Sequence, residues 1–227
     1  VTYVAISPDG KLAATGAGYY GAIKVWDIST GHEIAISPAE LGASLSLSFS
    51  LDGKYLMGGG DGFAALWRVS TGERIKTLDN YQRVTSLAFS PDGKNILTGS
   101  DGIGGAAGRF FGGSVRVWDL GTDLETLDQP KDSQDLEGIS GKDMVNSIAF
   151  SHDNQLILAS VSILPEQGAQ QFSSLMWWNA STRKLITPGN ERGILPISRY
   201  AIIREGTRRV SKEYPQPASR RTNSRRG

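Results

Sequence analysis

Apolar and polar residues alternate along short stretches of this chain. From Val84 to Ser90 the residues Val, Ser, Ala and Ser alternate with Thr, Leu and Phe, the period-two pattern of a strand with one better-buried face. This stretch runs into a Ser-Pro-Asp-Gly turn. Further strands are then predicted over Asn95–Ser100, Ser114–Leu120 and Leu124–Leu127. Together they predict one unit of four short antiparallel strands.

The Ser-Pro-Asp-Gly turn has a physical basis and it recurs. Proline presets φ, aspartate bonds its own backbone, and glycine takes the positive φ that closes a hairpin. Versions of it stand at Ser7–Gly10, Ser50–Gly53, Ser90–Gly93 and, as Ser-His-Asp-Asn, at Ser151–Asn154, with spacings of 43, 40 and 61 residues. The chain therefore repeats one structural unit with insertions in the later copies.

A tryptophan follows each turn at a similar distance. The four are Trp26, Trp67, Trp118 and Trp178, with spacings of 41, 51 and 60 residues. A period near 40 residues with insertions is typical of a propeller repeat. An antiparallel β-sandwich is the alternative, but it accounts for neither the period nor the recurring tryptophan. The predicted fold class is an all-β propeller with four-stranded blades.

These repeats resemble the WD40 family over residues 1–188. The dipeptide W-D stands at Trp26-Asp27 and Trp118-Asp119 and becomes W-R after Trp67 and W-N after Trp178. The family's G-H dipeptide is absent from every unit, and its nearest equivalents are Asn80-Tyr81 and Lys142-Asp143. The resemblance implies a buried network of His, Asp and Trp, which is incomplete here. Asp61 and Asp101 are the candidates for its aspartate.

The repeat defines the expected domain organisation. Four blades are predicted at about residues 2–37, 44–78, 84–127 and 145–188, followed by a tail over 189–227. Propellers have four to eight blades, and the resemblance implies seven or eight. We therefore expect either a piece of a larger ring or a divergent member that closes with a partner. The sequence leaves the oligomeric state open.

Loop insertions point to a binding face. The loops Asp101–Gly113, Gln129–Met144 and Ser162–Ser174 all belong to the third and fourth blades and are predicted to emerge on the same face. Together with neighbouring loops they carry side chains that interfaces favour: Tyr19, Tyr20, Tyr81, Arg109, Phe110, Phe111 and Phe172. The alternative is that the insertions are merely tolerated and their aromatic side chains fold back on the blade.

The tail differs in charge from the repeats. The chain has a net charge of +1, but residues 187–227 hold 10 Lys and Arg against 3 Glu. The stretch Arg204–Gly227 is rich in Arg, Ser, Thr and Pro and is expected to be disordered. Such a tail can bind nucleic acid, acidic partners or anionic lipid, or it can remain solvated. Base stacking is not expected, because Tyr214 alone interrupts the basic residues.

Sites for chemistry are not indicated. The 227 residues include no cysteine and only His32 and His152 as histidines, both in predicted turns, so no metal, cofactor or catalytic set is predicted. The glycine run from Gly102 to Gly108 lacks the spacing and the helix of a phosphate loop. No apolar run approaches a membrane span, and the expected location is cytoplasmic or nuclear. The sequence predicts a non-catalytic scaffold for other proteins; the alternative is a nucleic-acid-associated factor that uses the basic tail.

Overall fold

The computed structural model contains only β-strands and their connections within the part of the chain that it describes. It describes residues 1, 3–16, 22–37, 46–80, 82–101, 112–120, 133–139, 143–163, 172–186 and 195–196. The strands of the first two repeats are β1 Tyr3–Ile6, β2 Leu12–Gly16, β3 Ile23–Asp27, β4 Glu33–Ser37, β5 Ser46–Phe49, β6 Tyr55–Gly59, β7 Phe63–Arg68 and β8 Arg74–Asp79. Those of the last two are β9 Val84–Phe89, β10 Asn95–Ser100, β11 Val115–Asp119, β12 Ser133–Asp135, β13 Met144–Phe150, β14 Leu156–Ile163, β15 Phe172–Asn179 and β16 Leu195–Pro196.

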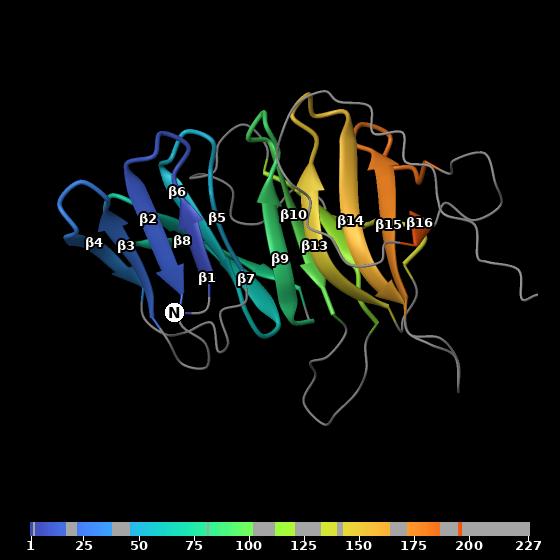
Figure 1. Cartoon of the computed structure of the whole chain (residues 1–227), viewed down its shortest axis with the longest axis horizontal. Helices are drawn as coiled ribbons and strands as arrows, with labels where there is room; N and C mark the ends of the chain where they lie inside the picture. The colour runs from blue at the N-terminus through green and yellow to red at the C-terminus, as the bar shows by residue number, and fades with distance from the viewer. Residues whose placement is uncertain are drawn as a thin grey trace, which may run out of the picture.

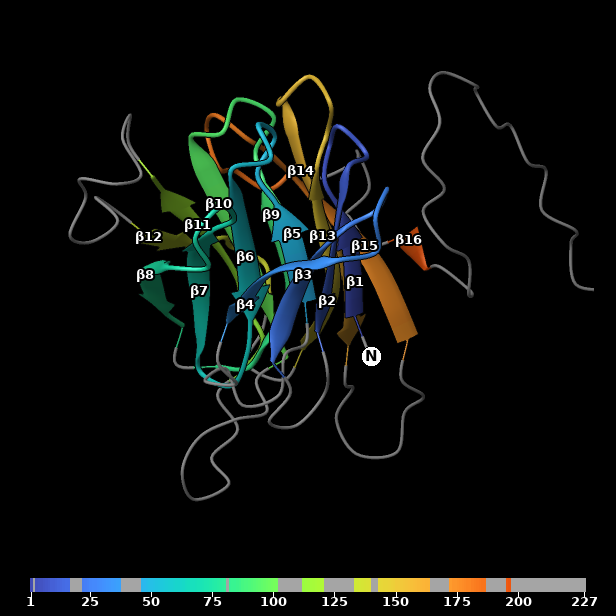
Figure 2. The ribbon, with the colours of Figure 1, turned by 90° about the vertical axis from the view of Figure 1, so that its left-hand side faces the viewer.

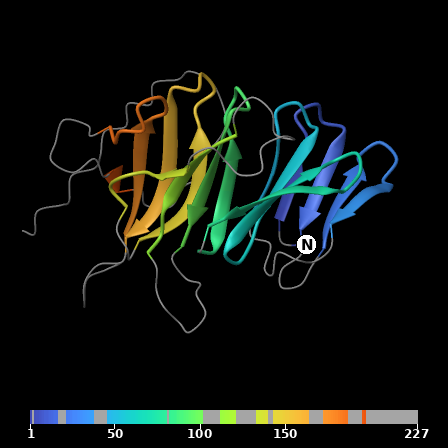
Figure 3. The same cartoon turned by 180° about the vertical axis from the view of Figure 1, so that it is seen from behind.

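These strands form four antiparallel sheets, one for each repeat. Each sheet has four strands in sequence order, from β1–β4 to β13–β16. The predicted all-β blade architecture is therefore confirmed. We call the sheets blades one to four. Figure 1 shows them side by side, with the first and fourth blades at opposite ends of the molecule, and Figure 3 shows the same arc from behind.

The Ser-x-Asp turns close the first hairpin of every blade in the same way. In the first blade, Ser7 Oγ donates to Asp9 at 2.6 Å, and the Lys11 amide donates to the same carboxylate at 3.1 Å. Gly10 has φ +73°, a conformation that residues with a Cβ rarely adopt. The Ser–Asp bond recurs from Ser50, Ser90 and Ser151. Asn154 replaces the glycine of the fourth turn, with φ +58°, as asparagine tolerates this region.

Successive blades pack face to face through three apolar cores. The innermost strands β1, β5, β9 and β13 lie next to one another in chain order. Between the first and second blades, Ala14 and Val25 pack with Phe49 and Trp67. Between the second and third, Met57 and Leu66 pack with Leu87 and Trp118; between the third and fourth, Leu97 and Val117 pack with Ile148 and Trp178. Each tryptophan after the first thus fills the space facing the preceding blade.

The third blade ends on a later edge strand than the expected Leu124–Leu127. Its edge is β12, in which Asp135 pairs with Arg116 of β11. The Arg116 guanidinium donates to both Asp135 oxygens at 2.7 and 2.9 Å, and the next residue, Leu136, is buried in the third core. These contacts explain the later position, and residues 124–127 lie outside the described residues.

The fourth blade also departs from its expected boundary. The sequence places the end of this blade at about residue 188. Near that position Leu185 bridges Trp178, and the Ile186 amide donates to the Trp177 carbonyl at 2.9 Å. A further edge strand follows as β16, whose Leu195 and Pro196 pair with Leu175 and Ser174 of β15. Two residues that the sequence assigned to the tail therefore pair with the fourth sheet.

Candidate functional site

The candidate site is the face of the molecule on which the second strand of each blade ends and the third begins. We call it the loop face, and the opposite face, which carries the Ser-x-Asp turns, the turn face. Six of the predicted partner-binding residues lie outside the described residues: Tyr19, Tyr20, Tyr81, Arg109, Phe110 and Phe111. Phe172 begins β15, and its side chain is also outside the description. The structure describes the strand ends from which these loops leave.

Gln82 contacts both ends of the loop between β10 and β11, residues 101–113, which we call the third-blade loop. Gln82 Oε1 accepts hydrogen bonds from the hydroxyls of Ser100 and Ser114, which stand at the two ends of this loop. The side-chain amide of Gln82 donates to the carbonyl of Gly112. The Ser114 amide also donates to Ser100 Oγ at 3.0 Å. One side chain therefore joins the strand before the loop to the strand after it.

An ion pair lies beside this glutamine. Arg83 Nε donates to Asp101 Oδ2 at 2.8 Å, and a second guanidinium nitrogen contacts the same oxygen. The Asp101 side chain is 3% exposed and that of Arg83 27%. A buried carboxylate is costly without a partner, so this pair fixes Asp101 at the root of the loop. Asp61, the other candidate for the aspartate of the WD40-type His, Asp and Trp network, is exposed in the second blade.

Backbone contacts join the same loop to the fourth blade. The Gly113 amide donates to the Asp143 carbonyl at 2.9 Å, just before β13 begins. A Cβ atom at Gly113 would overlap this carbonyl and that of Ser100. Only glycine fits at this crossing, so the loop leaves the third blade along a path that two backbone segments define.

The repeated tryptophans are held by different partners in different blades. In the third blade, Trp118 Nε1 donates to Thr98 Oγ1 at 2.9 Å, and Thr98 donates to Asn80 Oδ1 at 3.0 Å. In the first, Trp26 Nε1 donates to Thr15 Oγ1 at 2.8 Å, and in the fourth, Trp178 Nε1 donates to the Glu137 carbonyl at 2.9 Å. Asn80 therefore accepts the bond on the loop face, and it belongs to the Asn80-Tyr81 dipeptide that stands nearest to the family's G-H in this repeat.

The first W-D aspartate, Asp27, acts locally on the turn face. Asp27 accepts hydrogen bonds from the Ser29 hydroxyl and from the amides of Ser29 and Thr30. The bond from the Ser29 hydroxyl is the main reason why the pKa of Asp27 is lowered. Asn179 accepts equivalent bonds from Thr182 in the fourth blade, so W-N closes the same turn as W-D.

A second candidate surface, which sequence reasoning missed, lies on the turn face. A hollow of about 490 Å³ lies between the Ser-x-Asp turns of the second and third blades. Its apolar wall includes Leu51, Tyr55, Phe89 and Pro91. Leu51 is 62% exposed and occupies the position at which the first and third turns have proline. That departure from the repeat was the signal available in the sequence.

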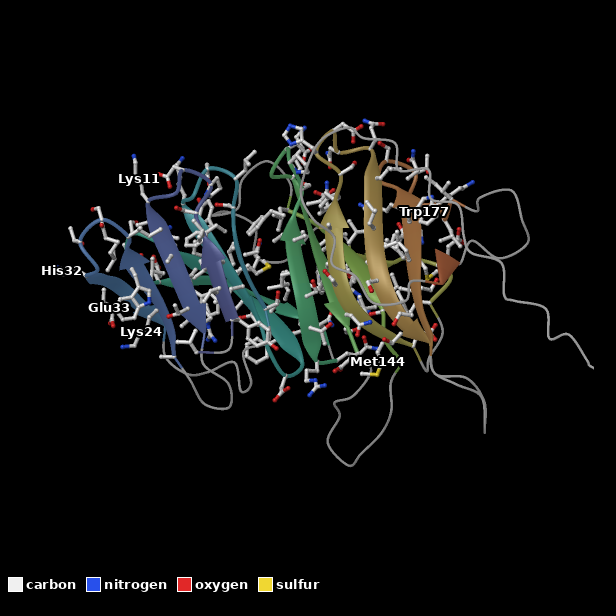
Figure 4. All side chains as sticks on the ribbon, in the orientation of Figure 1. Lys11, Lys24, His32, Glu33, Met144 and Trp177 are labelled. Atoms are coloured by element: carbon white, nitrogen blue, oxygen red, sulfur yellow. The ribbon has the colours of Figure 1, made fainter. Side chains whose placement is uncertain are left out.

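Metal-ligating side chains do not cluster on the described residues. Within those ranges, no cluster of three or more His, Cys, Asp or Glu residues could hold a metal ion. His32 is exposed near the outer edge of the first blade (Figure 4), and His152 belongs to the turn of the fourth. The described residues also form no helix with the length and apolar character needed to cross a membrane.

Comparison with known proteins agrees with the blade architecture. The family model "WD domain, G-beta repeat" matches residues 1–27 and 72–119. No curated protein sequence matches the chain. Among solved structures, hydrazine synthase of Kuenenia stuttgartiensis has 15% sequence identity and a TM-score of 0.62, over 82% of this chain and 47% of its own. The Cps50 (Swd1) β-propeller domain of Myceliophteria thermophila has 19% identity and a TM-score of 0.62, over 81% of this chain and 52% of its own. The chain thus spans about half the length of each, and identities this low show the fold alone.

Proposed function

We propose that this chain, whose WD40 repeats fold as propeller blades, is a non-catalytic scaffold that binds other proteins on its loop face. The proposal rests on one observation: polar contacts join the two described ends of the third-blade loop. Gln82, Ser100 and Ser114 make these contacts, and the Arg83–Asp101 pair lies beside them. Loops on a rigid scaffold are a common form of binding site.

Residues 102–111 supply the side chains that would contact a partner protein. They include Arg109, Phe110 and Phe111, and arginine and aromatic side chains are enriched among residues that dominate interface energetics. A platform of this kind needs no reaction centre. Its partners are other proteins, and an intracellular location, in the cytoplasm or nucleus, suits a chain without cysteines.

The test is capture of partners by the purified chain from an extract of its source cells. Phe110→Ala combined with Phe111→Ala is expected to remove a defined set of proteins from the captured fraction. The matched control is Ile34→Ala, which changes an exposed apolar residue on the edge strand β4 of the first blade. Capture should survive this control, and all variants should keep the thermal melting curve of the parent. Capture that survives the double change would refute the loop face as the site.

The basic tail supports a second candidate function, association with nucleic acid. Arg208-Arg209, Arg220-Arg221 and Arg225-Arg226 would supply phosphate contacts. Such binding falls steeply between about 50 and 200 mM salt. Removing residues 204–227 should abolish it, whereas capture through the loop face should survive the deletion. The deletion therefore separates the two functions.

A further inference from the structure

The hollow on the turn face lies between two neighbouring blades inside the arc. Its walls come from the β5–β6 turn of the second blade and the β9–β10 turn of the third, and its volume is about 490 Å³. Figure 2 shows the turns of these hairpins at the upper end of the molecule. Pockets that bind ligands commonly measure about 300–1,000 Å³, so this hollow is large enough to receive a side chain of a partner.

Two residues that line the hollow depart from the repeat. Leu51 occupies the position of proline in the first and third turns and of histidine in the fourth. Tyr55 occupies the position of leucine in the first and fourth blades and of asparagine in the third. Among the four repeats, the second alone carries leucine and tyrosine at these positions. The lining is therefore a property of this pair of blades and not of the repeat in general.

The turn itself does not require the leucine. The Gly53 amide donates to the Ser50 carbonyl at 3.0 Å, and the equivalent bond in the proline-containing first turn is 2.9 Å long. The glycines of the two turns have φ +70° and +73°. Leu51 is nevertheless 62% exposed, and the other exposed large apolar residues within the described ranges all precede the second blade. Its exposure therefore needs a reason other than the geometry of the turn.

Two aromatic residues connect the hollow to the apolar core. Tyr55 and Phe89 both line the hollow, and both pack against the core between the second and third blades. Because the core holds them, their apolar surface is in place before a partner arrives. With Leu51 and the partly exposed Pro91 they form one apolar patch. Contiguous exposed apolar patches commonly mark interaction sites.

Two carboxylates give the hollow a negative charge. Asp52 and Asp92 are its charged lining residues within the described part of the chain, and both are exposed. Burial raises the pKa of each carboxyl, but hydrogen bonds from the serine two residues before and the lysine amide two residues after it outweigh burial, so the pKa is lowered. Both groups are therefore ionised near neutral pH.

The lysines of the same turns leave this charge available to a partner. Lys54 Nζ lies 3.6 Å from Asp52, but the Lys54 side chain is 73% exposed and does not line the hollow. Surface ion pairs of this kind contribute little to stability, so a cation of a partner can replace the lysine. A second hollow of about 370 Å³ includes Lys54 and Arg68 beside Asp52 in its lining. Negative charge thus distinguishes the hollow between the second and third blades.

We propose that this hollow binds a segment of another protein in which a large apolar side chain is flanked by arginine or lysine. The apolar side chain contacts Leu51, Tyr55 and Phe89, and the flanking cations pair with Asp52 and Asp92. A small ligand is a poorer fit, because pockets bury most of the surface of such a ligand whereas the rim of this hollow is exposed. The inference goes beyond the proposed function, since the turn face and the loop face are opposite faces.

The binding test uses the whole chain and a set of short synthetic peptides that carry a fluorophore, followed by fluorescence anisotropy. The central residue of each peptide is leucine, methionine, phenylalanine or alanine, and the flanking residues are arginine, serine or glutamate. Peptides with a large apolar centre and arginine flanks should bind more tightly than peptides with an alanine centre or serine flanks. Peptides with glutamate flanks should bind least. Binding should weaken with added salt, because salt screens exposed charges.

Variants of the two turns locate the binding site. Leu51→Pro gives the second turn the residue of the first and third turns, so the fold should be kept while the affinity for the best peptide falls about tenfold. Asp52→Asn combined with Asp92→Asn should lower this affinity by about the same factor. The double variant should also lose most of the salt dependence, because its hollow no longer carries the two charges.

Matched controls change the same chemistry outside the hollow. Asp9→Asn removes the equivalent carboxylate, and its bond with Ser7, from the first turn. Ile28→Ala shortens an apolar side chain that is 49% exposed. Both variants should bind the peptide as the parent does, and the melting curve of every variant shows whether it is folded. Phe110→Ala with Phe111→Ala should also keep peptide binding, so failure of the loop-face proposal and failure of this one are separate results.

Four results would overturn the proposal. The first is a peptide set in which an apolar centre and arginine flanks give no advantage. The second is undiminished binding to the Leu51 and Asp52/Asp92 variants, which would place the site elsewhere. The third is binding of N-acetylarginine amide as tight as that of the best peptide, which would indicate a site for a small cation. The fourth is binding that is seen only after residues 204–227 are removed, which would make the basic tail the occupant.

Discussion

The indole nitrogen of Trp118 donates a hydrogen bond of 2.9 Å to Thr98, and both side chains are buried. The Thr98 hydroxyl in turn donates a hydrogen bond to Asn80 Oδ1, and Asn80 is 1% exposed. Strand three of the third blade is thereby tied to strand two and to the segment that enters the blade. Asparagine thus serves in a network that the WD40 resemblance associates with histidine.

Replacing Thr98 by valine should destabilise the protein strongly. The change keeps the shape of the side chain but leaves the Trp118 indole N–H and the Asn80 carbonyl oxygen without this partner in the interior. Unpaired buried polar groups cost about 1–3 kcal/mol each, so we expect a loss of about 2–4 kcal/mol in the free energy of unfolding. Urea denaturation followed by tryptophan fluorescence measures it.

The matched control for this change is Thr15→Val in the first blade. Thr15 accepts the same bond from Trp26 at 2.8 Å, but Trp26 is partly exposed, so water can replace the lost partner. The expected loss is under about 1 kcal/mol. If the two variants lost equal amounts of unfolding free energy, the buried hydrogen bonds that join Asn80, Thr98 and Trp118 would contribute no more to stability than the partly exposed bond in the first blade.

Gly113→Ala should disturb the base of the third-blade loop. The added methyl group would overlap two backbone carbonyls, those of Asp143 and Ser100, and backbone cannot move aside as a flexible side chain does. We expect a loss of more than about 2 kcal/mol in the free energy of unfolding. The comparison is Gly93→Ala, where no atom lies within 4 Å of the added carbon but φ is +70°; it should cost about 1 kcal/mol. If Gly113→Ala lowered the free energy of unfolding by less than Gly93→Ala, the two carbonyl groups would not crowd the added methyl group as the structure indicates.

Gln82→Ala should loosen the ends of the same loop without unfolding the blades. Removing this side chain takes an acceptor from Ser100 and Ser114 and a donor from Gly112. Hydrogen–deuterium exchange is expected to rise at Gly112, Gly113 and Ser114. Gln155→Ala, at an exposed glutamine on the turn face, should leave exchange at these positions as in the parent. Unchanged exchange in the Gln82 variant would mean that other contacts hold the loop.

Stability should fall in acid because the turn aspartates are stabilised in their charged form. The Ser7 hydroxyl and the Lys11 amide lower the pKa of Asp9 below its usual 3.8. For Asp92, burial raises the pKa, but bonds from Ser90 and Lys94 outweigh it and the net shift is downward. A lowered folded-state pKa contributes stability above the unfolded value, and this is lost as pH falls through the folded value. Urea midpoints should therefore begin to drop near pH 3.8 and continue to drop below it.

The local cause of this acid sensitivity is testable at one turn. Ser7→Ala removes the largest contribution to the shift of Asp9, so the pKa of the Asp9 carboxyl should rise toward 3.8. Carboxyl carbon chemical shifts followed by NMR titration measure this directly. The pKa of Asp153, in the equivalent turn of the fourth blade, is lowered mainly by its own Ser151 and should not move in this variant.

Edge strands show where sequence reasoning reached its limit. The period placed the inner strands of the third blade correctly, since β9, β10 and β11 agree closely with the expected segments. The edge strand lies later because Asp135 pairs with Arg116 and Leu136 enters the core. The first blade has a similar ion pair between its edge strand and the neighbouring strand, because Glu33 of β4 lies 2.8 Å from Lys24 of β3. The partner-binding residues on the loops remain predictions.

The sequence alone determined what depends on neighbouring residues. Turns such as Ser7–Gly10 form from contacts two or three residues apart, and the alternation along Val84–Phe89 reports one buried face. Together with the period, these local features indicated blades of four strands. Tertiary structure decided what depends on residues far apart in the chain. Asn80 meets Thr98, Ser46 meets Leu87, and Val4 remains exposed while Leu87 is buried. Val4 and Leu87 occupy the same position in the repeat, and of the two, only Leu87 packs against a preceding blade among the described residues.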